Sequence, residues 1–394
     1  MMFTPNARSD RRLREFDRAL VIATHFGFRP MAAPRITERD LELTKDCRSY
    51  QHYDAVEKAA IIRTYLEQNF ASLPHPLALA YKKPVRLNSD LEESSIRKWP
   101  GGYTLHFIGT LSGIAEATLI RAALSILSEE GYKNMRVDIN CIGDKESINA
   151  YERELINFAR KFGTDMSDES KQSLKEDVFN LFRLETPEAV RLRETVPSAI
   201  TFLSTPSRVY FKEVLEYIEA LGVEFRLTPE LVGERNHTSH TIFAIKNTEG
   251  EIRDILAIGY RYSRLGRHFG LKKEIPMAGV TVFSTSLGRV PPRVYKELPK
   301  PKFYLIQLGR EAKIKTLAII ELLRQNHIPL HHFLGKDKID TQLANAENLR
   351  VPYLIIIGQK EALDNTATVR NVATRAQDTV NILDLPRYLK RITL

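Results

Sequence analysis

Prolines close to residue 300 divide this chain into two parts that have different hydrophobic patterns. They occur at Pro291–Pro292 and Pro299–Pro301. Proline has no backbone N–H and a fixed φ angle, so this stretch interrupts helices and sheets. Proline-rich segments also act as semi-rigid spacers. We therefore expect a domain boundary here, with one domain over residues 1–298 and a second over residues 299–394.

The part after the prolines alternates between short apolar runs and helical patterns. Its expected strands are Phe303–Leu308, Leu330–Phe333, Tyr353–Ile357 and Thr366–Val372. Helical patterns at 310–326 and 339–348 separate them. Nearly continuous apolar strands are typical of strands buried on both faces. The alternation therefore predicts an α/β unit around a buried, partly parallel sheet.

The part before the prolines has an antiparallel pattern. β-rich runs at Thr241–Ile245 and Ile255–Ile258 flank a polar turn, which indicates a hairpin. Gly279–Phe283 supplies a third such run, and Leu231–Thr238 is expected to form a strand or strand edge. These runs predict one antiparallel sheet. Helical spacing occurs at Arg11–Phe26, Ala55–Phe70, Ile114–Gly131, Ser147–Phe162 and Asp168–Phe182.

The composition excludes several classes of protein. With 43% hydrophobic and 27% charged residues over 394 positions, the chain has the composition of a soluble globular protein of two or three domains. No apolar run approaches the ~20 residues that span a bilayer, and the N-terminus lacks the apolar core of a signal peptide. Cys47 and Cys141 have no metal-ligand spacing, so we expect reduced thiols, a cytoplasmic location and no metal site.

The charge is unevenly distributed along the chain. The net charge is +9, and residues 299–394 contain 15 Lys and Arg against 9 Asp and Glu, so this segment alone carries +6. A basic surface of this kind fits a polyanionic partner. A solvated basic surface without a partner is the alternative explanation.

Three segments in the first part resemble, in order and spacing, the active-site segments of histidyl-tRNA synthetases. Leu231–Thr238 resembles the family's Leu-Val-Arg-Gly-Leu-Asp-Tyr-Tyr, and Ala257–Leu265 resembles its Gly-Gly-Gly-Arg-Tyr-Asp-Gly-Leu. Ala278–Leu287 resembles class II motif 3, Gly-Phe-Ala-x-Gly-Leu-Glu-Arg-Leu. In the second part, Val351–Glu361 and Thr366–Asn371 are similar to the anticodon-binding domain of the same enzymes, and this is the strongest resemblance.

The resemblance implies a fold and an assembly. The fold would be an α+β class II aminoacyl-tRNA synthetase-like antiparallel sheet domain with a helical insertion at about 145–222. An α/β anticodon-binding-like domain would follow it. Class II motif 1 forms a dimer interface in this family, so a homodimer is expected. The partner that the family implies is tRNA or a tRNA-like RNA.

The chain departs from the family's pattern where the chemistry is done. Gly233 stands where the family has its catalytic arginine, and Ser286 replaces the arginine of motif 3. Activation of histidine by ATP concentrates negative charge that arginine's planar fork neutralises, and losing one such donor costs about 3–4 kcal/mol of transition-state stabilisation. No catalytic residue is therefore assigned. The resemblance implies a possible ATP or substrate pocket at Arg86, Arg235, Asn236, Tyr260, Arg261 and Tyr262.

These observations favour a histidyl-tRNA synthetase-like paralog that binds RNA without activating histidine. The residues expected to contact RNA lie in or beside predicted loops and strand ends: Lys336, Lys338, Arg350, Lys360, Arg370 and Arg375. One alternative is an active histidine–tRNA ligase that uses ATP and Mg²⁺ with a displaced set of charges. Another is a regulatory protein similar to the synthetase-like subunit of ATP phosphoribosyltransferase. That subunit lacks the C-terminal domain, which argues against this alternative.

Overall fold

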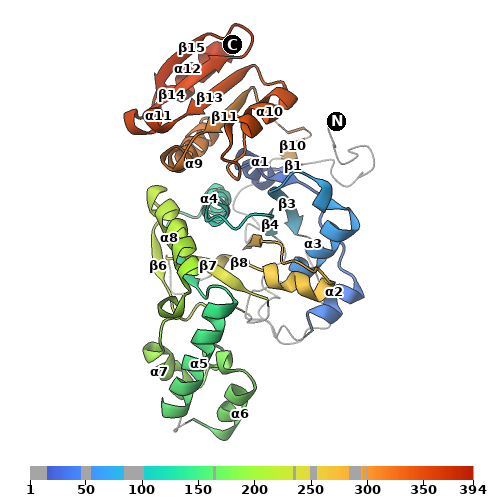
Figure 1. The fold of residues 1–394 in the computed structure, drawn as a ribbon, viewed down its shortest axis with the longest axis vertical. Coiled ribbons are helices and arrows are strands. Elements are labelled where there is room, and N and C mark those ends of the chain that lie inside the picture. The colour runs from blue at the N-terminus through green and yellow to red at the C-terminus, as the bar shows by residue number, and fades with distance from the viewer. Residues whose placement is uncertain are drawn as a thin grey trace.

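The computed structural model contains an eight-stranded sheet, a five-stranded sheet and one short two-stranded pairing. Figure 1 shows the five-stranded sheet at one end of the molecule, next to the C-terminus, and helices α5 to α7 at the other end. The structure describes residues 16–45, 55–83, 102–162, 166–233, 237–248, 255–283, 294–295, 297–298 and 300–393. The two-stranded pairing joins β1 (Phe16–Asp17) to β10 (Val294–Tyr295).

The eight-stranded sheet is mostly antiparallel, as the sequence predicts. Its strands, in spatial order, are β2 (Arg29–Pro30), β3 (Leu77–Lys83), β4 (Gly102–Ile108), β9 (Met277–Phe283), β8 (Ile255–Arg261), β7 (Ser239–Asn247), β5 (Met135–Cys141) and β6 (Phe225–Leu227). The expected pairing of the run at 241–245 with the run at 255–258 is confirmed, because β7 and β8 pair antiparallel. Among the described pairs of this sheet, only the two at its edges, β2 with β3 and β5 with β6, are parallel.

The expected strand at Leu231–Thr238 is wrong for the residues that the structure describes. Residues 231–233 and 237–238 have no strand assignment, and residues 234–236 lie outside the described part of the chain. Instead, the backbone N–H of Leu231 donates to Thr228 O at 3.0 Å. This local turn uses the backbone groups that a sheet ladder would need.

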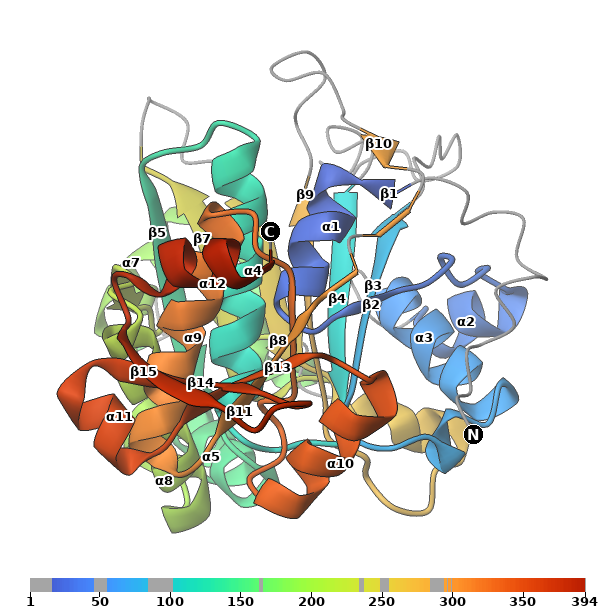
Figure 2. The same ribbon diagram turned by 90° about the horizontal axis from the view of Figure 1, so that it is seen from above.

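Helices cover both faces of the large sheet (Figure 2). On one face lie α1 (Arg18–His25) and α4 (Ile114–Glu129), and α8 (Thr205–Ala220) packs against α4. On the other face lie α2 (Glu38–Leu43) and α3 (Ala55–Glu67), together with the 3-10 segment η5 (Ser263–Phe269). Because side chains alternate along a strand, the sheet separates two hydrophobic clusters, one under each set of helices.

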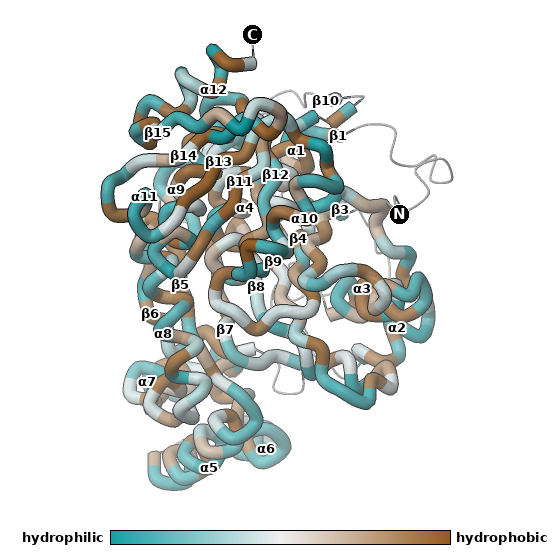
Figure 3. The backbone as a smooth tube through the Cα atoms, turned by 45° about the horizontal axis from the view of Figure 1, so that its top comes forward, coloured by the Kyte–Doolittle hydropathy of each residue, from teal (hydrophilic) through white to brown (hydrophobic). Residues whose placement is uncertain are grey.

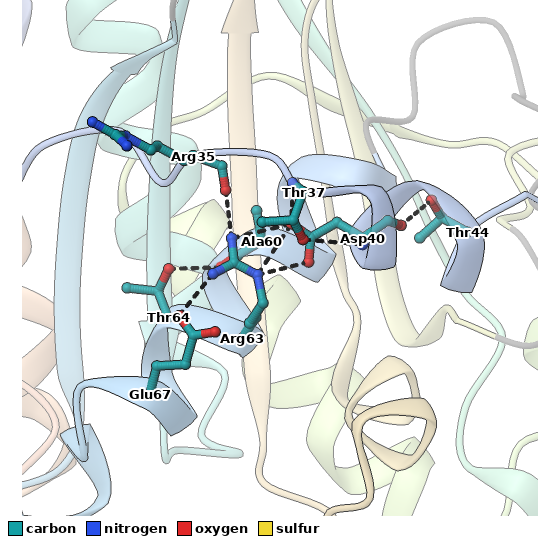
Figure 4. Close-up of polar contacts among 8 residues, drawn as sticks. All are labelled: Arg35, Thr37, Asp40, Thr44, Ala60, Arg63, Thr64 and Glu67. Atoms are coloured by element: carbon teal, nitrogen blue, oxygen red, sulfur yellow. Dashed lines mark hydrogen bonds and ion pairs between the residues drawn. The ribbon is translucent and has the colours of Figure 1, made fainter.

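A guanidinium clamp fixes α3 to α2 (Figure 4). Arg63 on α3 donates from Nε to Asp40 Oδ1 at 3.0 Å and from Nη1 to Glu67 Oε2 at 2.7 Å. It also donates to the carbonyl oxygen of Arg35. Asp40 is fully buried, and its other oxygen accepts from the N-cap residue Thr37 at 2.8 Å. The clamp therefore holds the segment before α2, α2 itself and α3 as one unit over the sheet.

A helical region lies between β5 and β6. It contains α5 (Lys145–Phe162), α6 (Asp168–Glu176), η3 (Val178–Phe182), α7 (Pro187–Thr195), η4 (Ala199–Phe202) and α8. Small clusters of buried side chains hold the helices from α5 to η4 together, whereas α8 packs into the larger cluster with α4. Figure 3 shows α6 as largely hydrophilic, in keeping with its exposed position. This region falls in the interval expected for the helical insertion, whose bounds of about 145–222 stay a prediction.

The five-stranded sheet has the expected α/β character. Its spatial order is β12 (Leu330–His332), β11 (Phe303–Gln307), β13 (Tyr353–Ile357), β14 (Thr366–Asn371) and β15 (Gln377–Asn381). The first three strands are parallel to one another. Strand β14 is antiparallel to both of its neighbours, β13 and β15. The helices are α9 (Arg310–Gln325), α10 (Ile339–Leu349), α11 (Gln359–Asp364) and α12 (Leu385–Thr393). The predicted mixed fold is therefore confirmed, while the boundary at 298–299 stays a prediction.

Helices α4 and α9 join the two sheets through a buried ion network. Glu321 on α9 pairs with Arg324 on the same helix and with Arg121 on α4, both at 2.8 Å. Ser125 donates to the second carboxylate oxygen of Glu321 at 3.0 Å, and Arg324 reaches Glu129 at 3.1 Å. Burial raises the pKa of Glu321, but the hydrogen bond from Arg324 and the charges of Arg121 and Arg324 outweigh burial and lower the pKa to about 2. Glu321 is thus the centre of the junction. Within the described part of the chain, no helix is long and apolar enough to cross a membrane.

We predict that Glu321→Gln lowers the free energy of unfolding by about 3 kcal/mol, because it removes the buried negative charge that pairs with both Arg121 and Arg324. Because the folded-state pKa is depressed, the carboxylate stabilises the protein above its ordinary pKa of 4.5. That contribution is lost as the pH falls toward 2. The difference in the free energy of unfolding between wild type and variant, measured by urea titration, should therefore narrow as the pH falls from 4.5 to about 2. Glu311→Gln, on the exposed side of the same helix, is the control, and an equal effect from both variants would contradict the assignment.

Candidate functional site

The structure separates the three described residues of the expected substrate pocket. Tyr260 and Arg261 are successive residues of β8, and Tyr262 follows the strand directly. Their side chains alternate across the sheet. Tyr260 and Tyr262 lie in the cluster on the α3 face, with ring centroids 6.3 Å apart. Arg261 points to the opposite face. The other expected positions, Arg86, Arg235, Asn236 and Ser286, lie outside the described residues.

Arg261 is fully buried and is bound by other parts of the protein. Its Nε lies 2.6 Å from Glu116 Oε1, and its Nη2 donates to Glu116 Oε2 at 3.0 Å. The same side chain donates to the hydroxyl of Tyr210 at 2.9 Å and to the carbonyl oxygens of Thr110 at 2.8 Å and Ser112 at 3.3 Å. The guanidinium therefore connects β8 to α4, to α8 and to the loop that precedes α4. This is the geometry of a structural ion pair.

We predict that Arg261→Met lowers the free energy of unfolding by about 3 kcal/mol or more, because Glu116 is left as an unpaired buried charge. Arg267→Met is the matched control. Arg267 also pairs with a carboxylate, Glu274, at 3.3 Å, but its side chain is 61% exposed, and such surface pairs contribute at most about 1 kcal/mol. Urea denaturation of both variants measures the difference. Similar losses in the two would contradict the structural role of Arg261.

On the α3 face, a set of buried polar side chains interrupts the apolar layer. We call it the inner-face cluster, and its members are Glu57, Lys58, Tyr81, His106, Tyr262 and Thr281. His106 Nδ1 lies 2.8 Å from the Tyr262 hydroxyl, and its Nε2 lies 3.3 Å from the Tyr81 hydroxyl. Tyr81 in turn donates to Glu57 Oε2 at 3.2 Å. The cluster thus runs from α3 across β3, β4 and β9 to the end of β8.

The hydrogen bonds of His106 match a neutral ring. Burial lowers the pKa of His106 well below its ordinary value, and the nearby charge of Lys58 lowers it further. A neutral imidazole donates from one nitrogen and accepts at the other. The two tyrosine hydroxyls supply one partner for each nitrogen. His106 is therefore a packing residue whose two ring nitrogens both have hydrogen-bond partners.

Gly233 has no room for the arginine that the family resemblance implies. A Cβ atom at this position would lie 2.2 Å from Thr238 Oγ1 and 2.7 Å from Thr238 Cβ. Thr238 is fully buried, so it cannot move outward into solvent without a local rearrangement. An arginine at position 233 therefore also requires Thr238 to shift.

The six residues expected to contact RNA lie at two ends of the five-stranded sheet. Lys336 and Lys338 follow β12, and Lys360 follows β13, so these three lie at the carboxyl ends of the parallel strands. Arg350, Arg370 and Arg375 lie at the opposite end, where β13 begins and β14 ends. A strand of five residues spans about 17 Å. The six residues therefore form two separate groups.

Two buried charged residues were not identified from the sequence, Lys58 in the inner-face cluster and Glu116, the partner of Arg261. Lys58 lies on the same helical stripe as Ile61, Ile62 and Tyr65, and all four are buried. Glu116 is likewise a buried position on the apolar helix α4. A charged residue at i with apolar residues at i+3, i+4 and i+7 is the signal that could have found them.

The chain is similar to histidine–tRNA ligases over most of its length. Residues 302–392 match the family model described as the anticodon binding domain. The histidine–tRNA ligase of Bacillus licheniformis is 26% identical over 344 residues, which cover 85% of this chain and 80% of that protein. The ligase of Ehrlichia ruminantium (strain Gardel) is 26% identical over 387 residues, or 93% and 91%.

A solved structure shares the fold. The apo crystal structure of S. aureus histidyl-tRNA synthetase has a TM-score of 0.52 and 20% identity, covering 93% of this chain and 92% of that one. Among the described residues, no three His, Cys, Asp or Glu side chains gather in a way that could hold a metal ion.

Proposed function

The chain belongs to the histidyl-tRNA synthetase family of class II, and from this premise we propose that it binds tRNA or a related RNA and does not activate histidine by itself. The observation that carries the proposal is the position of Arg261. This arginine matches the second active-site segment of the family, yet it points away from Tyr260 and Tyr262 and is paired with Glu116. It is not available to a phosphate on the tyrosine face.

The chemistry of activation explains why this position matters. In the family, histidine is joined to tRNA with ATP and Mg²⁺, and negative charge accumulates while pyrophosphate leaves. Pre-organised guanidinium groups stabilise that charge because they need no reorganisation. Gly233 supplies none, and Thr238 occupies the space beside it. The described residues therefore fit poorly with an ATP site of the family's kind.

We predict that the protein shows no histidine-dependent ATP–pyrophosphate exchange above the rate measured without histidine. The B. licheniformis ligase, assayed in parallel, is the positive control. Exchange at a rate similar to that of the control would overturn the proposal and favour the alternative of an active histidine–tRNA ligase, which the names of the relatives support.

The RNA-binding part of the proposal rests on charge and on the second sheet. The segment 299–394 carries +6, and phosphate contacts supply most of the non-specific affinity for nucleic acid. The anticodon binding domain match covers the same segment. It also argues against a subunit similar to that of ATP phosphoribosyltransferase, which lacks this domain. A homodimer formed through the first part of the chain belongs to the proposal, and light scattering tests it.

We predict that removing either basic group weakens tRNA binding and makes its salt dependence shallower by about one unit for each phosphate that the protein no longer neutralises. One variant carries alanine at Lys336, Lys338 and Lys360, and the other carries alanine at Arg350, Arg370 and Arg375. A third, with alanine at Lys145, Lys161 and Lys175, removes the same charge from the helical region and is the control. Filter binding at several salt concentrations measures all three. Unchanged affinity and slope in both test variants would contradict RNA binding by this sheet.

A further inference from the structure

Lys58 carries an ammonium group into the layer between α3 and the large sheet. The residue is only 1% exposed. The clamp between Arg63 and Asp40 holds the helix from which it projects (Figure 4). A charged group in an apolar layer destabilises the fold unless ligands replace its lost water. The groups around Nζ must therefore act as its ligands.

Those groups form a site of a recognisable chemical kind. Lys58 Nζ donates to Thr281 Oγ1 at 3.2 Å. It also lies 5.8 Å from the ring centroid of Tyr260 and 5.9 Å from that of Tyr262. Aromatic faces within about 6 Å attract cations, and such faces recognise organic ammonium ligands in proteins. One hydroxyl and two aromatic rings are thus among the groups that contact the ammonium.

A second hydroxyl lies beside the first. Thr104 on β4 is paired directly opposite Thr281 on β9, so their side chains are neighbours on the same face. Thr104 is fully buried, and its Oγ1 has no hydrogen-bond partner among the described residues. Buried hydroxyls normally have a partner. This unsatisfied oxygen is an independent sign that the face is built to contact a polar ligand.

We propose that Thr281, Tyr260 and Tyr262 form a binding site for a primary ammonium group, and that the protein fills this site with its own Lys58. A free ligand of the same chemistry, such as the α-ammonium of an amino acid, would have to displace Lys58. The site is therefore closed to such ligands in the native protein. This inference rests on the proposed function in one step only, the identification of the tyrosine face with the substrate pocket. It gives a reason why histidine does not bind in that pocket.

The test removes the side chain of Lys58 and asks whether a small ammonium compound added to the solution can replace it. Lys58→Ala removes the side chain beyond Cβ, and n-propylammonium has the chemistry of the missing part. We expect n-propylammonium chloride to raise the Tm of Lys58→Ala saturably, by about 2 °C or more, compared with sodium chloride at equal ionic strength. The neutral analogue 1-propanol should not raise it. Wild type and Lys58→Met, in which the site stays filled by a side chain, should show no ammonium-specific rise.

The outcomes separate this inference from the proposed function. If Lys58→Ala does not fold alone, refolding from urea with and without n-propylammonium replaces the Tm measurement, and recovery should need the ammonium. No ammonium-specific gain in either assay overturns the inference. Thr281→Val in the Lys58→Ala background should abolish the gain, and a gain that persists also overturns it. Pyrophosphate exchange by the wild type reports on the proposed function alone, so the two can fail independently.

Discussion

The buried ion pair between Arg261 and Glu116 is the interaction on which the rest of the structure depends. It joins the middle of the large sheet to α4, with both side chains at 2% exposure or less. Helix α4 in turn carries Arg121, Ser125 and Glu129, which hold α9 and with it the second sheet. A buried charge is stable only when its partner is fixed in place. The pair therefore fixes the position of α4, and α4 fixes the position of the second sheet.

The same pair shows how one strand divides its side chains between the two faces of the large sheet. A strand presents alternate residues to opposite faces, so one sheet position decides whether an arginine meets a substrate or a helix. In this chain Arg261 meets α4, while its neighbours Tyr260 and Tyr262 meet α3. The ammonium beside the two tyrosines belongs to Lys58, which is bound to the protein itself. One face of the sheet is thus held by the ion pair between Arg261 and Glu116. On the other face, the side chain of Lys58 occupies the space beside the two tyrosines.

The second sheet shows a different division between structure and function. Its core is formed by apolar strands whose side chains pack against α9 on one face and α10 on the other. The basic residues lie outside this core, at the two ends of the strands. Substitutions there change the electrostatic field with little effect on packing. The charge at these strand ends is therefore set independently of the packing of the core.

The sequence by itself determined the elements that carry strong periodic patterns: β13 was predicted with its observed bounds, and β7, β8, β9 and α9 were predicted within a few residues. It did not predict β15, four of whose five residues are polar and exposed, or the amphipathic helix α12 that follows it. The tertiary structure alone decided the partners of Arg261 and Lys58. Glu116 is 145 positions away from Arg261, and Thr281 is 223 positions away from Lys58. Local periodicity shows that a side chain will be buried, but only the packing of distant elements brings the countercharge or hydroxyl that makes burial of a charge stable.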